Sequence, residues 1–419
     1  MRRMFLSAAA AVCAAGFAQA AQFQPTTGGN LDDAANWNTP SDTTYAITKR
    51  QSAALSISAD NATLPNSAAS LSYRSYTYTN DWTSGWTLSG TGYLEVQSGA
   101  GLVHESGTMK FSKATGSSVA GTLEITGAGS VVELGSTTVS GTIVVTNSAV
   151  FKPDMNVTVD SGGSLLVDGA TLHHNVPDTG TSYAITVNGG GEFFAKNSTI
   201  TLPTAKSALK PVGATAVIDG CTIDVGNQSV VLGGDGGTLL FTGSPSTINR
   251  RFTMSGDDFT FCVSNATVNF APTAASDLFI TGSGSADENY ARILRFCGAA
   301  PRLAIASSNG LYLRGAKGIT LQFDIGRDGY PSDQAVVEIT GGGRFNGDTT
   351  TLSTSQIVVN IDAHTAPGTY TLLKGKNAAT FLTGENKWVT NSDRAVISAN
   401  GNDEVVVTVK AMGLAIIFR

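Results

Sequence analysis

A six-residue phrase recurs along this chain, and its spacing constrains the fold more than any other feature. The copies begin and end on an apolar residue, carry Asn or Gly at the third position, and run over 145–150, 167–172, 195–200, 218–223 and 263–268. A sixth copy, over 241–248, contains a two-residue insertion. The steps along the third position, from Asn147 through Gly169, Asn197, Gly220 and Gly243 to Asn265, are 22, 28, 23, 23 and 22 residues. Such a period indicates a solenoid in which each repeat is one coil.

The residue type at the third position indicates how each coil turns its corner. Asn and Gly enter the left-handed backbone region at the lowest cost, so we expect a row of left-handed corners. A coil of about 22–23 residues has room for three short strands and three turns. The sequence therefore predicts an all-β fold, a right-handed parallel β-helix with β-rich caps at both ends. Charged residues make up only 14% of the chain, against roughly 25% in a typical globular domain, as suits stacked strands.

Alternation along the strand before each corner assigns its residues to two faces. The inward set is Ile143, Val145, Leu165, Val167, Phe193, Ala195, Ala216, Ile218, Leu239, Phe241, Phe261 and Val263. The outward set, which we call the outer strip, is also apolar and consists of Val144, Leu166, Phe194, Val217, Leu240 and Cys262. An exposed strip of this size marks an interaction surface. The alternatives are a loop or cap lying over it, or contact with a partner chain, another copy or a membrane surface.

A second outward position carries charges on three successive coils, Asp168, Lys196 and Asp219. Neighbouring coils lie about 4.8 Å apart, so these side chains fall within reach of one another. The pattern favours an exposed salt-bridge ladder, which contributes little to stability. The alternative is an acid–base patch of the kind that carbohydrate-cleaving enzymes use.

Changes in composition and in residue pattern divide the chain into four parts. Residues 1–20 form a predicted signal peptide, with Arg2 and Arg3, an apolar stretch from Phe5 to Phe17 and a small-residue cleavage site at 18–20. We expect an N-terminal cap over 21–92, the parallel β-helix over 93–360 and a C-terminal β cap over 361–419, where 413–419 ends the chain on an apolar strand. One exception inside the coils is Ser285 to Phe296, where Ser285 and Glu288 fit a capping box and predict a lateral loop or a short helix.

Five aromatic residues cluster in the predicted N-terminal cap: Tyr73, Tyr76, Tyr78, Trp82 and Trp86. A solenoid must close its open ends, so these rings are expected to fill the cap. The alternative is a sugar-binding surface of exposed aromatic faces, which would make the chain a carbohydrate-binding module.

The sequence contains no recognisable catalytic or metal-binding motif, and we predict no catalytic residue, no metal site and no cofactor. The histidines are His104, His173, His174 and His364, and the adjacent pair at 173–174 points to opposite faces of a strand, which makes a poor chelate. Without the signal peptide's two arginines, 24 basic residues stand against 32 acidic ones, a charge of −8, which argues against nucleic acid as a partner. No later apolar run is long enough for a transmembrane helix. Three cysteines remain in the mature chain, an odd number that does not form a disulfide framework. We expect Cys221 to be buried and inert.

Two phrases near the ends of the chain resemble those of bacterial autotransporter-associated β-strand repeat proteins. The first, over 29–37, contains Asp33, Ala35, Asn36 and Trp37 in the phrase that opens many such proteins, and the second, over 368–373, is similar to the phrase that closes many passengers. The resemblance implies a secreted parallel β-helix rich in Gly, Ser and Thr. Autotransporters end in a membrane barrel, and we expect none after the coils of this chain. The pectate-lyase-like enzymes share the fold, but their active-site motifs are not recognisable here.

Together these observations predict an exported protein, extracellular or at the cell surface with the periplasm as the alternative, that acts as a non-enzymatic structural or adhesive rod. A polysaccharide, a cell-surface component or a second copy of the chain are the alternative partners. A polysaccharide lyase or hydrolase and a carbohydrate-binding module are the alternative functions.

Overall fold

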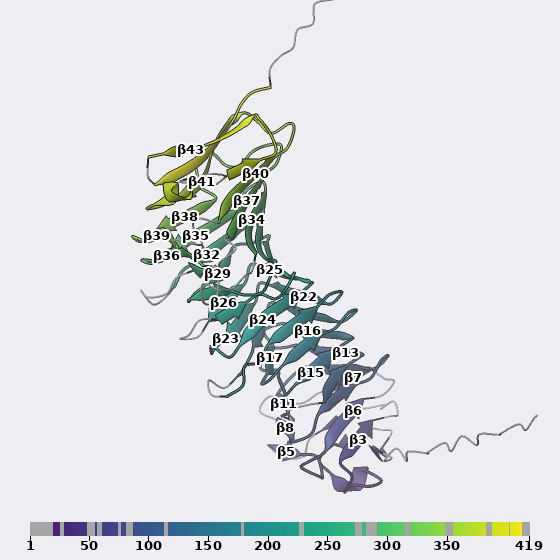
Figure 1. The fold of residues 1–419 in the computed structure, drawn as a ribbon. Helices are drawn as coiled ribbons and strands as arrows, with labels where there is room; N and C mark the ends of the chain where they lie inside the picture. Colours follow the sequence, from purple (N-terminus) through teal and green to yellow (C-terminus); the bar gives the residue numbers. More distant parts are fainter. Residues whose placement is uncertain are drawn as a thin grey trace, which may run out of the picture.

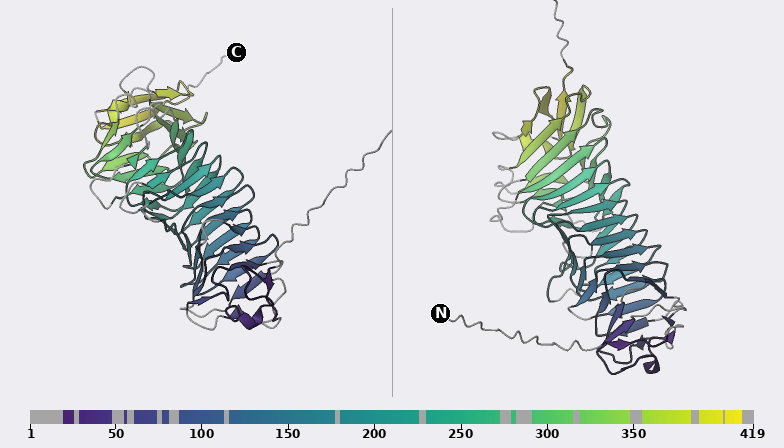
Figure 2. Two further views of the ribbon diagram at one scale, coloured as in Figure 1. Left: turned by 60° about the horizontal axis from the view of Figure 1, so that its bottom comes forward. Right: turned by 90° about the vertical axis from the view of Figure 1, so that its right-hand side faces the viewer.

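The computed structural model shows an elongated rod in which the chain winds into stacked coils (Figures 1 and 2). It describes residues 20–25, 29–47, 55–56, 61–73, 77–80, 87–112, 116–176, 180–225, 230–272, 279–281, 291–314, 319–347, 355–382, 388–401 and 403–412. N-terminal coils lie at the purple end of Figure 1 and C-terminal coils at the yellow end. The helical content of the described residues is two short 3-10 turns, η1 (Ala34–Asn36) and η2 (Ala378–Leu382).

Three long sheets form the sides of the rod. The first sheet contains β1 (Ala21–Gln22), β3 (Thr44–Ile47), β6 (Ser70–Tyr73), β9 (Leu94–Val96), β12 (Ser117–Val119), β15 (Thr137–Val139), β18 (Val157–Val159), β21 (Ile185–Asn188), β24 (Ala208–Val212), β27 (Val230–Leu232), β30 (Phe252–Met254), β33 (Phe279–Ile280), β36 (Gly310–Leu313) and β39 (Arg344–Gly347). The second sheet contains β7 (Thr77–Asn80), β10 (Gly101–His104), β13 (Thr122–Ile125), β16 (Thr142–Thr146), β19 (Ser164–Asp168), β22 (Glu192–Lys196), β25 (Thr215–Asp219), β28 (Thr238–Thr242), β31 (Phe259–Ser264), β34 (Arg292–Gly298), β37 (Ile319–Ile325), β40 (Gln356–Ile361) and β42 (Trp388–Thr390).

The third sheet contains β5 (Ala62–Thr63), β8 (Thr87–Gly90), β11 (Thr108–Phe111), β14 (Val131–Leu134), β17 (Val150–Pro153), β20 (Thr171–His173), β23 (Thr199–Leu202), β26 (Thr222–Val225), β29 (Ser246–Ile248), β32 (Thr267–Phe270), β35 (Arg302–Ala306), β38 (Val337–Thr340), β41 (Gly368–Lys374), β44 (Glu404–Val409) and β43 (Ala395–Asn400). A separate two-stranded sheet pairs β2 (Gly29–Asn30) with β4 (Leu55–Ser56).

Each coil adds one strand to each long sheet, as the path β9, β10, β11 and then β12 shows. The ladders between successive coils are parallel, for example β16 with β19 and β19 with β22. The predicted all-β parallel β-helix is therefore confirmed. The prediction of a loop or short helix over Ser285 to Phe296 is wrong for its last five residues, which lie in β34.

The predicted row of Asn and Gly corners follows the second sheet. Asn147, Gly169, Asn197, Gly220, Gly243 and Asn265 have φ angles of 54°, 59°, 48°, 63°, 67° and 50°. Backbone bonds join each corner to the next coil: the amide of Gly169 donates to the Lys196 carbonyl at 3.0 Å, and that of Asn197 to the Asp219 carbonyl at 2.9 Å. The corners thus stack in one row, and only residues that tolerate the left-handed region occupy it.

The core runs along the axis of the rod, between the three sheets. All twelve members of the predicted inward set are buried to 1% exposure or less. Phenylalanine rings stack along part of it, with Phe261 centred 4.9 Å from Phe241 and 5.4 Å from both Phe252 and Phe279. Each such ring buries a large apolar area, and the stack continues the hydrophobic contact from coil to coil.

The N-terminal end is closed by an aromatic cluster of Phe23, Trp37 and Tyr45, whose adjacent rings lie edge to face at 5.1 Å and 4.5 Å. Asp33 caps η1 by accepting from the Ala35 amide at 2.9 Å, and the Trp37 indole donates to the Leu31 carbonyl at 3.0 Å. The coils themselves begin inside the range 21–92, because β3, β6 and β9 form one continuous parallel ladder. The aromatic plug is therefore shorter than the predicted cap.

The C-terminal end changes from parallel to antiparallel pairing. β41 continues the third sheet in parallel with β38, but its other edge pairs antiparallel with β44, which in turn pairs antiparallel with β43. This change falls inside the range 361–419. The predicted apolar strand over 413–419 lies outside the described residues.

Candidate functional site

The outer strip lies along the outer face of the second sheet. The ladders place Val144 beside Leu166, then Phe194, Val217, Leu240 and Cys262, each on the next coil. The first five side chains are partly exposed, whereas Cys262 is buried with 5% exposure. Cys262 therefore lies in the predicted outward column but is covered, which was the alternative to an exposed strip. Its thiol packs against that of Cys297, with the two sulfur atoms 3.8 Å apart, and this neighbour covers it.

The predicted charge ladder lies in the next outer column. Asp168 is in register with Lys196, and Lys196 with Asp219. Among the described residues, however, no ion pair joins them, and Asp219 instead accepts a hydrogen bond from the Ser244 amide at 2.7 Å. Within the described part of the chain the expected salt-bridge ladder does not form, and the Lys196 ammonium has no ion-pair partner there.

The two ends of the strip carry opposite charges. Glu124 precedes Val144 in the same column, and Arg295 follows Cys262. The Arg295 guanidinium pairs with the Asp324 carboxylate at 2.7 Å. Burial alone would raise the pKa of Asp324, but hydrogen bonds from Asn360, Gln322 and Arg295 hold it below its usual value. The outer strip is therefore flanked in its column by the Glu124 carboxylate on one side and by the ion pair of Arg295 with Asp324 on the other.

The thiols differ in their surroundings. Burial raises the pKa of the Cys221 thiol, which is 1% exposed, as expected for an inert cysteine. A hydrogen bond from the Cys262 thiol, together with Ser264 and the nearby Arg295, lowers the pKa of Cys297, and the same bond raises that of Cys262. Cys297 is therefore the thiol of this pair that loses its proton first.

Sequence reasoning missed an ion-pair ladder on the third sheet. Lys110, Glu133 and Lys152 are in register, with Nζ–Oε distances of 2.6 and 2.8 Å. Burial would raise the pKa of Glu133, but the two ammonium groups hold it below its usual value. A signal was present, because each of these three charges stands between two core residues, such as Met109 and Phe111.

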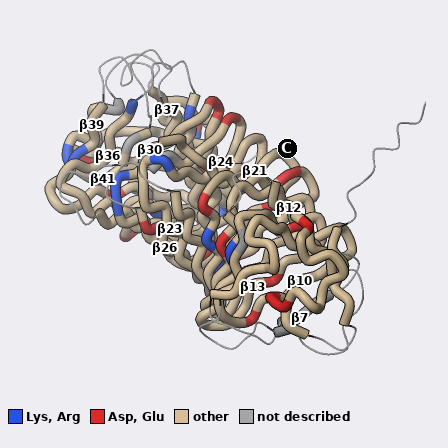
Figure 3. The backbone as a smooth tube through the Cα atoms, turned by 90° about the horizontal axis from the view of Figure 1, so that it is seen from below, with Lys and Arg blue, Asp and Glu red and all other residues tan. Residues whose placement is uncertain are grey.

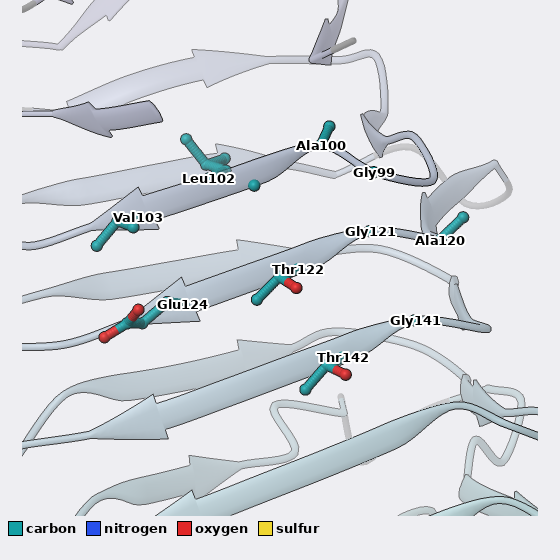
Figure 4. Close-up of a pocket in the computed structure, with 11 residues that line it drawn as sticks. Gly99, Ala100, Leu102, Val103, Ala120, Gly121, Thr122, Glu124, Gly141 and Thr142 are labelled. Atoms are coloured by element: carbon teal, nitrogen blue, oxygen red, sulfur yellow. The ribbon is translucent and has the colours of Figure 1, made fainter. Parts of the chain in front are cut away.

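A groove of about 470 Å³ adjoins the acidic end of the strip. Figure 4 shows Thr122 and Glu124 on one strand of the second sheet, β13, and Thr142 on the next strand, β16, at this groove. The backbones meet closely here, since a Cβ on Gly121 would lie 2.2 Å from the Ala100 carbonyl oxygen and one on Gly141 2.1 Å from that of Gly121. Among the described residues that line the groove, Glu124 is the one carboxylate, whereas glycoside hydrolysis needs a pair.

A second concave region of about 450 Å³ lies over the third sheet near its C-terminal end. Its charged residues are joined as pairs, Arg302 with Glu338 at 2.6 Å and Lys374 with Glu404 at 3.9 Å. Asp333 is a further carboxylate of its lining. The paired cations hold the Glu338 and Glu404 side chains in place.

The aromatic residues proposed for sugar binding are not gathered on a described surface. Tyr73 is buried with 2% exposure, as expected of a ring that fills the interior, and it is therefore not part of an exposed sugar-binding face. Tyr78 lies in β7, and Tyr76, Trp82 and Trp86 lie outside the described residues. Core packing explains Tyr73, whose ring faces the interior of an early coil.

The histidines are also accounted for by local bonding. His104 and His174 are buried, and their ring nitrogens pair with the Gly107 and Met155 carbonyls at 3.0 and 2.9 Å. Burial lowers the pKa of each to about 4. Within the described ranges no three His, Cys, Asp or Glu side chains converge as metal ligands.

Charge is scattered over the rod rather than gathered in one block, as Figure 3 shows with its interspersed blue and red segments. No helix among the described residues is long and apolar enough to cross a membrane. No family model, curated protein or solved structure matches the chain.

Proposed function

We propose that this chain is an exported, non-enzymatic rod with a structural or adhesive role, and that the outer face of its second sheet is the contact surface. One observation carries the proposal: five apolar side chains remain partly exposed in one column along consecutive coils. Core packing does not require apolar residues at outward positions. A stack of hydrogen-bonded coils holds such a column straight, so that it can meet an extended partner.

The proposal is tested by location and by adhesion. An antibody against the chain should find it outside the cytoplasm when the source cells are fractionated, and the purified chain should bind to those cells. The double variant Phe194→Ser and Leu240→Ser should lose this binding and keep its thermal stability. Val150→Ser is the matched control, because Val150 is a partly exposed apolar residue on the third sheet.

Cytoplasmic location of the full chain would contradict the proposal, as would a strip variant that binds cells as well as the control does. A strip variant that unfolds would show that the column is covered in the native protein. A stable strip variant with unchanged adhesion would move the contact surface elsewhere on the rod.

Polysaccharide cleavage is the second candidate function, and the charged region over the third sheet favours it. Glu338 and Glu404 stand on either side of Lys374 in register, and glycoside hydrolysis uses a pair of carboxylates. Incubation of the purified chain with acidic and neutral polysaccharides tests it. Release of shorter chains by the parent, lost in Glu338→Gln, would show that the protein is an enzyme. Intact polymer would support the non-enzymatic rod.

A further inference from the structure

On the outer face of the second sheet, an acidic residue precedes the outer strip and a basic residue follows it. The central column runs Glu124, then the outer strip of six residues, then Arg295, with each residue in register with the next. Its midpoint falls between Phe194 and Val217. A rotation of 180° about that midpoint exchanges the two ends, so that Glu124 takes the position of Arg295.

We propose that the outer strip docks on the outer strip of a second copy of this chain, with the two rods antiparallel. The two-fold axis runs along the strands between the coils of Phe194 and Val217. In this register Glu124 faces the second copy's Arg295, Leu166 faces Leu240, and Phe194 faces Val217. The pairing is isologous, so every contact occurs twice. This inference rests on the proposed function and names its partner as the chain itself.

The flanking column agrees with the same register. Lys196 and Asp219 belong to adjacent coils on either side of the axis, so each Lys196 faces an Asp219 of the second copy. Asp168 then faces Thr242, and across the strip Glu192 faces Thr215. The ammonium of Lys196 makes no ion pair within its own chain among the described residues, although two carboxylates flank it. A second copy supplies the missing partner.

A parallel arrangement of the two rods is less complementary. With the axis along the rod, Lys196 would face Glu192 of the second copy, but Glu124 would face Glu124. The like charges at Glu124 oppose association, whereas the antiparallel register joins Lys196 to Asp219 at the centre and places no like charges against one another. The charges thus favour the antiparallel orientation.

The size of the surface sets the expected affinity. Eight coils extend about 34 Å at the spacing of hydrogen-bonded strands, and five strand residues span about 13 Å. The contact would bury roughly 1,000 Å² over both copies, near the lower limit for a specific interface. We expect a dissociation constant on the order of 1–100 µM, with Phe194 at the centre as the main apolar anchor.

Charge exchange at the centre of the interface tests the partner. Sedimentation equilibrium of the full mature chain should show a monomer–dimer equilibrium that weakens with salt. Lys196→Asp and Asp219→Lys should each weaken dimerisation at least about tenfold, because each variant faces like charges twice. An equimolar mixture of the two variants should restore the dimer, since both central pairs are then opposite in charge. Lys210→Asp, on the outer face of the first sheet, is the matched control and should leave the dimer unchanged.

Single cysteines test the orientation. Leu166→Cys mixed with Leu240→Cys should give an oxidised heterodimer on denaturing gels, because these positions face each other in the antiparallel register. Leu166→Cys alone should not cross-link, and cross-linking of that variant with itself would indicate parallel rods and overturn the proposed register. Cys262→Ser and Cys297→Ser belong in all these variants.

Several outcomes would overturn the proposal. If the mature chain remains monomeric at about 100 µM, a second copy is excluded as the partner of the outer strip. A dimer insensitive to both charge variants places the interface elsewhere. A monomer that co-sediments with lipid vesicles or polysaccharide, and loses this binding in Phe194→Ser, assigns the strip to those partners and leaves the proposed rod function intact. The two proposals therefore fail separately.

Discussion

The second sheet has two stretches that share their inner face and differ on their outer face. From Val144 to Cys262 the outer column is apolar, and successive members are mostly 22 or 23 residues apart. From Arg295 onward the column is polar at Arg295 and Gln322, and the steps to Arg295 and from Gln322 to Val358 lengthen to 33 and 36 residues. The inner residues of the later stretch, such as Phe296 and Phe323, are as buried as those of the earlier one.

This difference shows which constraint each face obeys. The ladders remain in register through the longer coils, so the added residues enter between strands and not within them. Every coil must fill the same interior, and its inward residues are therefore mostly apolar, with buried exceptions such as His104 and Arg292. Outward residues are free of that requirement, and an apolar column there needs a separate explanation.

The largest expected effect separates inner from outer positions on neighbouring strands. Phe261→Ala removes a ring that contacts three other phenylalanines, and it should lower the free energy of unfolding by about 3–5 kcal/mol. Leu240→Ser, on the outer face of β28, should change it by less than about 1 kcal/mol. Urea denaturation followed by circular dichroism checks both. Equal losses would show that the outer strip is packed like the core.

The corner row gives the next largest effect. Asn197 has φ 48°, and Asn197→Ala should lower the free energy of unfolding by about 1–2 kcal/mol, because alanine lacks the short polar side chain that lets asparagine adopt the left-handed conformation. Asn197→Gly should stay within about 0.5 kcal/mol of the parent. Asn269→Ala, in the strand β32, is the control. A similar loss in Asn269→Ala would assign the effect to the amide group and not to the backbone.

The reactivity of the cysteine thiols gives a smaller difference between the two stretches. Cys297 should react with a thiol reagent at least about tenfold faster than Cys221 in the native protein, because its pKa is lowered and it is partly exposed, whereas burial raises the pKa of Cys221. Mass spectrometry of a labelling time course measures both rates. Rapid labelling of Cys221 without denaturant would contradict its placement in the core.

Glu133 offers a pH-dependent test on the third sheet. Glu133→Gln should lower the free energy of unfolding by about 1 kcal/mol at neutral pH through loss of two charge-assisted bonds. The folded pKa of Glu133 lies below its unfolded value, so its stabilisation is complete above a pH of about 4.3 and is lost as the pH falls through the folded pKa. Parent and variant should therefore converge in acid. A constant difference down to low pH would rule out the carboxylate charge as the cause.

The smallest effect belongs to the exposed pair of Arg295 and Asp324. Arg295→Gln should change the free energy of unfolding by about 0–1 kcal/mol, and high salt should remove the difference. Denaturation at low and high ionic strength measures it. A loss of several kcal/mol would show that this later stretch depends on its outer face for stability, in contrast to the earlier one.

Most of the architecture could be predicted from the sequence, because coil stacking repeats one local requirement many times. The Asn or Gly at each corner and the alternation before it both follow from backbone sterics, and each copy of the phrase reinforces the others. The first coils were harder to predict, since strands such as β6 contain buried residues on successive positions and show no alternation.

The contacts of outward side chains could not be predicted from the same pattern. Register places Lys196 beside two aspartates, but whether the charges meet depends on rotamers and on local competitors such as the Ser244 amide that binds Asp219. Cys262 was assigned to the correct face, yet the 33-residue coil that follows carries Cys297 to the position that covers it. Long-range neighbours of this kind are set by insertion length, which the repeat does not encode.

The row of left-handed corners makes each coil an interchangeable unit. A coil contacts only the one before and the one after it, so duplicating or deleting a whole unit would change the distance between the aromatic plug at Trp37 and the antiparallel strands at the other end in increments of about 4.8 Å. The molecule is in this sense a ruler, with a reach that gene duplication can reset without any redesign of its ends.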